Sequence, residues 1–302
     1  MFGFSNSRPG RGISKEDAAK RNYFDIFGRH LGHIIGANFW YLLANIIFFG
    51  AALVLGYAYF NGDNFFKIVS YILQGKNFFV PPLPFVPFMF IGPFTAGYTY
   101  VIRNYAKQEP TFLISDFFEH SKRNWKQAII TSIISVVLGY LLTQAFVFYN
   151  SFFIQNGLPM GVLYILFGLV FALYLIVMFY VYPIMITFKM SIKVIFKNAW
   201  TFAILKLPQN LIIFAVIFAV NAIVFWVMFL YLPTFVYLLF LGLFLTGFTA
   251  FTANYYIWHV MDKYIVSLVK PKNNDAIFND DEYPETDDDY DEEVEIEDEY
   301  LL

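Results

Sequence analysis

The segment Leu211 to Trp258 reads LIIFAVIFAVNAIVFWVMFLYLPTFVYLLFLGLFLTGFTAFTANYYIW, and none of its 48 residues is charged. As a single α-helix it would extend about 72 Å, more than twice the roughly 30 Å hydrocarbon core of a bilayer. Pro233 lies near the middle of the segment. The segment therefore predicts two membrane-spanning helices joined by a tight hairpin at Leu232-Pro233.

The rest of the chain supports a membrane class. Of the 302 residues, 59% are apolar and 14% are charged, whereas soluble domains have about 25% charged residues. We predict an all-α polytopic membrane protein with six transmembrane helices. The predicted spans are Ile34 to Phe60, Leu83 to Ile102, Ala128 to Phe153, Leu158 to Phe188, Leu211 to Leu232 and Thr234 to Trp258.

The distribution of basic residues predicts the orientation. The predicted connections alternate between rich and poor in Lys and Arg, with 18 on one side and 2 on the other. The positive-inside rule places the richer side in the cytoplasm. We therefore expect a multi-pass protein of the cell membrane with both termini in the cytoplasm.

Three domains follow from this pattern. Residues 1–33 form a cytoplasmic segment with an interfacial helix, residues 34–260 form the six-helix domain, and residues 261–302 form a cytoplasmic tail. Asp275 to Leu302 contains 15 acidic residues and no Lys or Arg, and the preceding chain has 20 basic and 8 acidic residues, a net charge of +12. Such a tail has little to bury, so we expect it to be disordered.

Amphipathic segments precede the predicted outward spans. Residues 114–126, 189–206 and 14–27 each place aromatic or aliphatic residues at helical spacing beside charged ones, a pattern typical of helices lying in the membrane interface. We expect these helices to contact the lipid bilayer or a protein partner, and no nucleic acid. The candidate contact residues are Lys122, Arg123, Lys126, Lys193 and Lys197.

The inward spans share a helix breaker followed by threonine. Gly92-Pro93 precedes Thr95, Pro183 precedes Thr187, and Gly247 precedes Thr249. Three helical hairpins, each led by an interfacial helix, would explain this order. Gly92, Pro93 and Pro183 are the candidate hinges.

Chemical motifs are absent from the sequence. The chain has no cysteine, and it contains no phosphate loop, nucleophile elbow or HExxH motif. We therefore expect no catalytic or cofactor-binding residues. We also expect no metal-binding residues, because His30 and His33 lack a third ligand. The uncharged polar residues within the spans would either bond helices together or line a polar cavity; they are Asn38, Asn45, Gln144, Asn221 and Asn254.

The external loop ends in a proline-rich stretch, Phe78-Phe79-Val80-Pro81-Pro82-Leu83-Pro84. Its prolines predict an extended aromatic lip before the second span. Such a lip would either pack over neighbouring helix ends or hold a partner or a sugar.

Several of these motifs resemble the YesL family of bacterial integral membrane proteins, over roughly residues 20 to 265. The first block comprises Gly92-Pro93-Phe94-Thr95-Ala96-Gly97, Tyr100-Val101-Ile102-Arg103, Asp116-Phe117-Phe118 and Asn124-Trp125-Lys126-Gln127-Ala128. The second comprises Pro183 to Lys189, Lys197-Asn198-Ala199 and Leu207-Pro208. The family has no established activity, and the resemblance implies a setting near carbohydrate uptake and polysaccharide degradation. The acidic tail departs from it.

Three functions remain open at this point. The first is a non-catalytic accessory or scaffold protein for carbohydrate uptake, in contact with an ATP-driven (ABC-type) sugar importer. The second is a facilitative transporter or channel for a small solute, to which the broken inward spans point. The third is a membrane enzyme, but the sequence shows no set of catalytic residues that would support it. The sequence leaves the oligomeric state open.

Overall fold

The computed structural model describes residues 22–59, 71, 74, 80–231 and 240–266. Nearly all of these residues are helical, and no strand occurs among them. The acidic tail and the hairpin at Leu232-Pro233 lie outside the described residues, as do residues 14–21 of the first amphipathic segment.

The first predicted hairpin corresponds to α2 (Tyr23–Tyr59), the 3₁₀-helix η1 (Leu83–Phe90) and α4 (Gly92–Lys107). The helices η1 and α4 meet at a 49° bend. Within the described residues, the first amphipathic segment continues directly into α2 rather than forming a helix of its own.

The proline-rich stretch is less extended than predicted. Residues from Leu83 onward form η1, because Pro84 is compatible with a helical first turn. Before it, the carbonyl of Val80 accepts hydrogen bonds from Tyr140 and Gln144 of the next long helix. The end of the stretch is therefore bound to that helix. Phe78 and Phe79 lie outside the described residues.

The second hairpin is formed by α6 (Trp125–Gln155) and α7 (Met160–Thr187). The short helices α5 (Leu113–Arg123) and α8 (Ile192–Leu205) precede α6 and follow α7, close to the predicted segments 114–126 and 189–206. Phe117 of α5 is fully buried, whereas Ile114 and Phe118 are exposed, so only part of the apolar face of α5 packs against protein.

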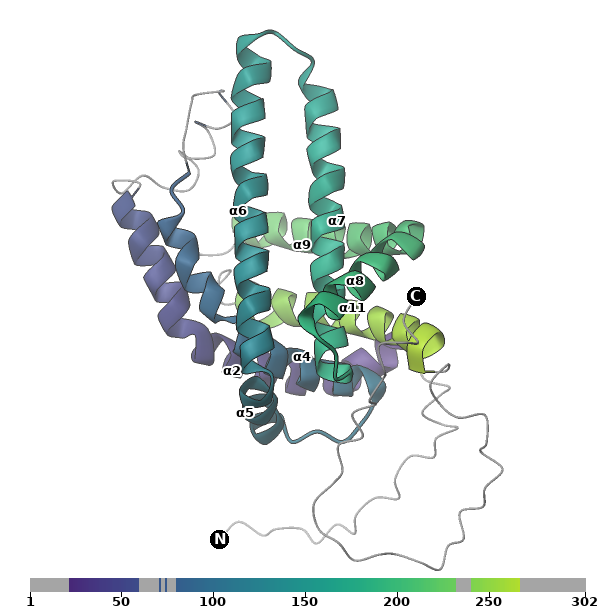
Figure 1. The fold of residues 1–302 in the computed structure, drawn as a ribbon. Coiled ribbons are helices and arrows are strands. Elements are labelled where there is room, and N and C mark those ends of the chain that lie inside the picture. Colours follow the sequence, from purple (N-terminus) through teal and green to yellow (C-terminus); the bar gives the residue numbers. More distant parts are fainter. Residues whose placement is uncertain (1–21, 60–70, 72–73, 75–79, 232–239, 267–302) are drawn as a thin grey trace, which may run out of the picture.

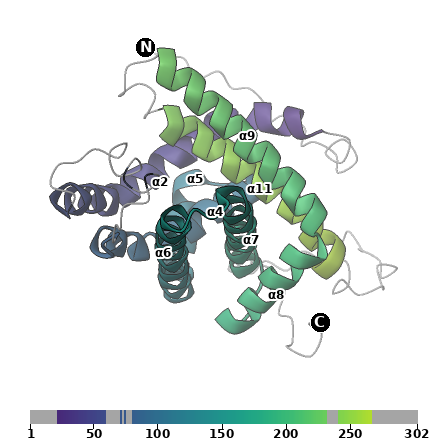
Figure 2. The same ribbon diagram turned by 90° about the horizontal axis from the view of Figure 1, so that it is seen from above.

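The last part comprises α9 (Leu207–Tyr231), the π-helical turn η2 (Leu241–Leu245), α11 (Thr246–Met261) and a second π-helical turn, η3 (Asp262–Val266). Figures 1 and 2 show α6 and α7 side by side, with α9 and α11 lying across them. The described helices therefore do not form one parallel bundle. Asn210, at the start of α9, accepts a hydrogen bond from Tyr180 of α7 at 2.8 Å and donates to the last carbonyls of α8, which fixes this change of direction.

Four of the described helices are long and apolar enough to cross a membrane, namely α2, α6, α7 and α9. The bent pair of η1 and α4 would be a fifth span. Large apolar side chains on these helices are exposed, including Leu141, Phe148, Ile165 and Phe218, as expected of lipid-facing surfaces. The all-helical membrane class is thus supported with four to five candidate spans.

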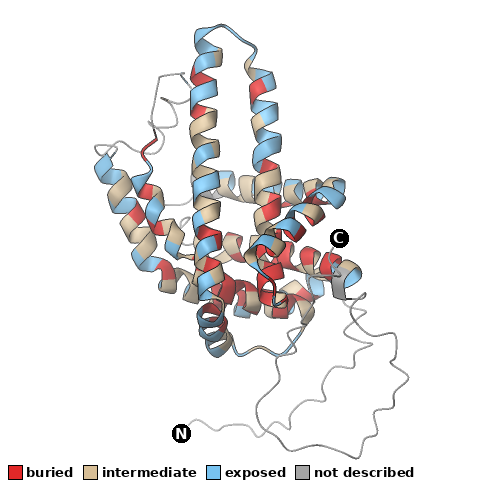
Figure 3. Ribbon diagram, viewed as in Figure 1, coloured by how far each residue is buried: buried red, intermediate tan, exposed pale blue. Residues whose placement is uncertain are grey.

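Burial is concentrated where α4 meets its neighbours, in the lower half of Figure 3. Two glycines allow this packing. A Cβ atom on Gly92 would overlap the Ala128 carbonyl of α6, and one on Gly97 would overlap the Phe117 carbonyl of α5. Helix α4 can approach both helices because these positions lack side chains.

We predict that Gly97→Ala destabilises the protein by about 1–3 kcal/mol, because the added methyl group overlaps the backbone of α5. The melting temperature of the detergent-purified protein should fall. The matched control is Gly50→Ala in α2, where a Cβ meets nothing within 4 Å. Equal melting temperatures for the two variants would contradict the close packing of α4 on α5.

Candidate functional site

A cavity of about 480 Å³ lies among α2, α4, α7, α9 and α11. It draws residues from all three predicted hairpins, and we call it the central cavity. Its lining residues are Tyr41, Thr95, Tyr98, Thr99, Met178, Phe179, Tyr182, Pro183, Asn221, Leu245, Thr246, Thr249, Ala250, Ala253 and Asn254. Cavities of this volume accommodate small organic ligands.

Hydrogen bonds between helices orient several polar groups of the central cavity. The hydroxyls of Tyr41 and Thr95 are 3.1 Å apart, which joins α2 to α4. Asn221 of α9 donates to the Thr249 hydroxyl of α11 at 2.9 Å. Tyr98 donates to Asn38 of α2. The polar lining is thus held in place by protein partners.

Asn254 differs from these groups. Its side chain is 6% exposed, and its amide nitrogen donates to the Ala250 carbonyl of its own helix at 2.8 Å. Its Oδ1 atom has no hydrogen-bond partner in the described part of the chain. A buried acceptor without a partner costs about 1–3 kcal/mol, so this oxygen favours a hydrogen-bond donor in the cavity.

The lining of the central cavity carries no Asp, Glu, Lys, Arg or His among the described residues. Its polar groups are hydroxyls, which donate and accept, and carboxamides. Tyrosine and phenylalanine rings lie beside them. Such a surface suits a neutral solute with several hydroxyl groups and an apolar ring face, and it offers no charge to retain an ion.

The candidate hinges lie beside this cavity. Gly92 and Pro93 form the first turn of α4, directly after the 49° bend and just before Thr95. Pro183 is buried within α7, which continues through it to Thr187. Proline has no N–H group to donate to the carbonyl four residues earlier, here that of Phe179. Both Phe179 and Pro183 line the cavity.

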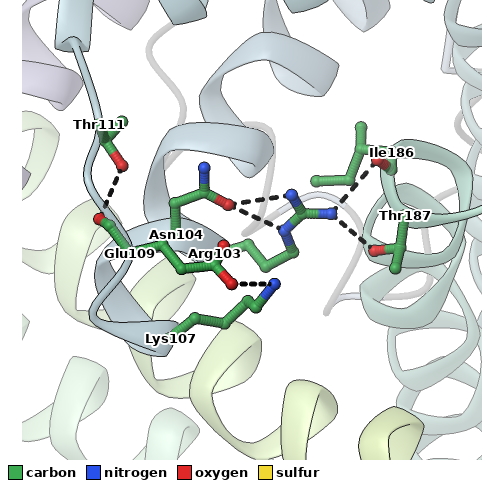
Figure 4. Close-up of polar contacts among 7 residues, drawn as sticks. All are labelled: Arg103, Asn104, Lys107, Glu109, Thr111, Ile186 and Thr187. Carbon is green, nitrogen blue, oxygen red and sulfur yellow. Dashed lines mark hydrogen bonds and ion pairs between the residues drawn. The ribbon is translucent and has the colours of Figure 1, made fainter. Parts of the chain in front are cut away.

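About one turn of α7 beyond the cavity residues Tyr182 and Pro183, Arg103 joins the ends of α4 and α7 (Figure 4). Its side chain is 6% exposed. Nη1 donates to the Thr187 hydroxyl at 2.8 Å and to the Ile186 carbonyl at 3.2 Å. Nε and Nη2 both donate to Oδ1 of Asn104, at 3.1 and 2.9 Å. The guanidinium thus lies at the C-terminal end of α7, where a positive charge is favourable.

A second cation follows one turn later. The Nζ atom of Lys107 is 2.6 Å from Oε1 of Glu109 and lies 4.1 Å from the centre of the Trp258 ring. Because Trp258 belongs to α11, this contact joins the end of α4 to a third helix. Arg103 and Lys107 together hold α4, α7 and α11 at one end of the cavity.

The predicted contact residues divide between two surfaces. Lys122, Arg123 and Lys126 line a groove of about 640 Å³ between the α5–α6 junction and the α7–α8 connection. We call it the basic groove. Lys193 and Lys197 are exposed on α8 and are absent from its lining.

The other intramembrane amides have structural partners. Asn38 donates to the Leu243 carbonyl of η2, and Gln144 binds the Val80 carbonyl. Asn45 donates to Tyr41 of its own helix at 2.8 Å. The Asn38 bond joins α2 to η2, and the Gln144 bond joins α6 to the stretch before η1. Asn221 both joins α9 to α11 and lines the cavity, which Asn254 lines as well.

The rings of His30 and His33 are 6.1 Å apart, and both lie against the ring of Tyr105. Within the described ranges, no group of three His, Asp or Glu side chains is placed to hold a metal ion.

Sequence reasoning did not select Arg103, Tyr41, Tyr98 or Tyr182. The tyrosines are inconspicuous among 22 in the chain. Arg103 stands out in the sequence only as the end of the Tyr100-Val101-Ile102-Arg103 motif, and its position directly after an apolar span was the available signal.

Comparison with known proteins adds one family. Residues 34–146 match a family described as "Protein of unknown function, DUF624". The match covers a little over a third of the chain and includes α4, α5 and most of α2 and α6. Neither the curated proteins nor the solved structures contain a significant match.

We predict that Arg103→Lys lowers stability by about 2 kcal/mol or more, because an ammonium cannot bind Asn104, Ile186 and Thr187 together. Thermal unfolding of the detergent-purified protein measures the effect. Arg29→Lys is the matched control, since Arg29 is exposed on α2. If both variants unfold at the wild-type temperature, Arg103 does not join α4 to α7.

Proposed function

We propose that this chain is a multi-pass membrane protein that binds a small, neutral, polyhydroxylated solute in the central cavity and carries it passively across the membrane. A sugar is the solute class we favour. The observation that carries the proposal is the uncharged polar lining, with the buried Oδ1 atom of Asn254 left without a partner.

The absence of charge from the lining supports passive rather than ion-coupled movement. Transporters that use a proton or ion gradient place ionisable groups within the membrane, and the described lining has none. Nor does the lining bring together a nucleophile and a base. A catalytic role is therefore no part of the proposal.

Two of the helices that line the cavity contain breaks about which they would move. Helix α4 is bent against η1 at Gly92-Pro93, and α7 lacks one backbone hydrogen bond at Pro183. Broken helices beside a binding site are typical of transporters. We propose that α4 and α7 move about these hinges, and that Arg103 closes the cytoplasmic end by joining them.

We also propose six spans in the cell membrane, arranged as three hairpins, with both termini in the cytoplasm. The 18 to 2 distribution of Lys and Arg supports the orientation. The continuous helical stretch from η2 through η3 supports the sixth span. Because α9 and α11 lie across α6 and α7 (Figure 1), these two helices would be strongly tilted relative to the others.

An accessory role in carbohydrate uptake is the second candidate. Lys193, Lys197 and Trp200 are exposed on α8, which leaves them accessible to a partner such as an ABC-type sugar importer. The resemblance to the YesL family adds the carbohydrate setting. Under this proposal the protein would have no transport activity of its own.

We predict that Asn254→Ala weakens solute binding by about tenfold, because the solute loses a buried hydrogen-bond acceptor. The measurement is the rate at which radiolabelled neutral monosaccharides enter liposomes that contain the purified protein. The dependence of this rate on solute concentration reports the change in binding. Asn45→Ala is the matched control: Asn45 is also buried, donates to its own helix at 2.8 Å and has an unpartnered Oδ1 in the described chain, but it is absent from the cavity lining.

Two outcomes would contradict solute transport. Liposomes with wild-type protein that admit no member of the panel faster than empty liposomes would exclude the activity and leave the accessory role. Equal losses of solute entry in the Asn254 and Asn45 variants would show that the central cavity is not the binding site.

The proposed topology predicts which positions react from outside. In this cysteine-free chain, single cysteines at Asn156 and Thr234 should react with an impermeant thiol reagent in whole cells. A cysteine at Ser115, which is exposed on α5, should react after permeabilisation only. Labelling of Ser115→Cys in intact cells would reverse the orientation, and protection of Thr234→Cys would show that α9 and α11 do not cross the membrane.

A further inference from the structure

The basic groove contains four cationic side chains and no carboxylate among its described lining residues. Its lining comprises Lys122, Arg123, Asn124, Trp125, Lys126, Gln127, Met185, Phe188, Lys189, Met190 and Ser191. Lys122, Arg123, Lys126 and Lys189 are exposed. Such a surface attracts anions, and the proposed solute site uses none of these residues.

Two helix beginnings face the same groove. Helix α6 begins at Trp125, after the N-cap residue Asn124, and α8 begins at Ile192, after the N-cap residue Ser191. Neither N-cap side chain bonds to its helix as a cap, and Asn124 instead donates to the His120 carbonyl at 3.2 Å. The N-terminal turns therefore add positive potential and N–H donors to the cationic side chains.

The groove has an apolar part as well. Met185, Phe188 and Met190 are 2–5% exposed and line it together with Trp125, whose ring is half exposed. Gln127 donates to the Met190 carbonyl at 3.0 Å, which binds the α7–α8 connection to the start of α6. The cationic rim and the apolar wall are thus held together by protein contacts.

The position of the groove indicates which anion it meets. It lies where α5 leads into the apolar helix α6 and where the apolar helix α7 leads into α8. Both junctions are at the lower end of the α6–α7 pair in Figure 1. Basic pockets between membrane helices at this level bind anionic lipid headgroups. A free phosphate compound would bind the cationic side chains and leave the half-exposed Trp125 without a partner from the ligand.

We propose that the basic groove is a binding site for an anionic phospholipid, with the headgroup phosphate among Lys122, Arg123, Lys126 and Lys189 and an acyl chain against the half-exposed Trp125. Because the groove spans the α5–α6 and α7–α8 junctions, a bound lipid links the second hairpin to both of its short helices. This site is separate from the central cavity and does not depend on solute transport.

Native mass spectrometry of the detergent-purified full chain tests the proposal, with phosphatidylglycerol as the probe. Phosphatidylcholine and diacylglycerol serve as zwitterionic and phosphate-free comparisons. We expect preferential retention of phosphatidylglycerol. Changing Lys122, Arg123 and Lys126 to Gln should weaken this retention about a hundredfold, since each of the three charges contributes about fivefold. The control Lys193→Gln/Lys197→Gln removes two exposed charges outside the groove and should retain most of the lipid.

Two further measurements test other ligands of the basic groove. Glycerol 1-phosphate tests a soluble phosphate, and a variant lacking residues 275–302 tests the chain's own acidic tail. The proposal expects weak binding of glycerol 1-phosphate and lipid retention in both chain lengths. It is overturned if phosphatidylglycerol and phosphatidylcholine are retained alike, or if the groove and control variants lose lipid equally. Tight glycerol 1-phosphate binding, or lipid binding that requires tail removal, also overturns it. Thermal unfolding confirms that each variant is folded.

Discussion

The close approach of α4 to α5 and α6 is the constraint on which the other described helices depend. It is possible because Gly92 and Gly97 present bare backbone to the Ala128 and Phe117 carbonyls. In hydrocarbon, helices gain little by burying apolar surface against each other, so close van der Waals contact and hydrogen bonds hold them together. With α4 in this position, Arg103 reaches the end of α7 and Tyr98 reaches Asn38 of α2. The residues Thr95, Tyr98 and Thr99 then line the central cavity.

The same arrangement separates two kinds of polar surface. Within the helical body, hydroxyl and amide groups gather around the central cavity, while the cationic side chains of the basic groove lie at the ends of α6 and α7. The cost of placing charge in hydrocarbon accounts for this division. Arg103 lies between the two surfaces and is bound by neutral oxygen atoms of Asn104, Ile186 and Thr187. The proposed neutral solute and the proposed anionic headgroup each match one of these two environments.

Much of the fold could be predicted from hydropathy alone. Four of the predicted spans correspond to the long apolar helices α2, α6, α7 and α9, and a fifth corresponds to η1 with α4. Both later amphipathic segments are present as α5 and α8. Each of these features depends on one segment of the sequence. A membrane-spanning helix forms its backbone hydrogen bonds within itself, and charged side chains are costly in hydrocarbon. The directions of α9 and α11 could not be predicted, since they depend on the contacts of Asn210 with Tyr180 and α8.

The candidate site was predictable to a lesser extent. Asn221 and Asn254 could be selected because amides are rare in apolar helices, but their different environments were invisible in the sequence. Both lie on helices that meet at the cavity, yet Asn221 donates to Thr249, while the Oδ1 atom of Asn254 has no partner among the described residues. Likewise, Lys126 and Lys193 carry the same charge, and the folded chain places Lys126 in the groove and Lys193 outside it.

By itself, the sequence determined that this chain is an all-helical membrane protein with a basic body and an acidic tail. The length of each apolar segment and the charge of each connection can be counted along the chain, and neither depends on how the helices pack. The tertiary structure alone decided which polar residues share a cavity and which cations share a groove. Those groupings join residues far apart in the chain, such as Tyr41 with Asn254 and Lys122 with Met190. They arise from packing between helices, in which the absence of a side chain at Gly92 or Gly97 matters as much as the residues that are present.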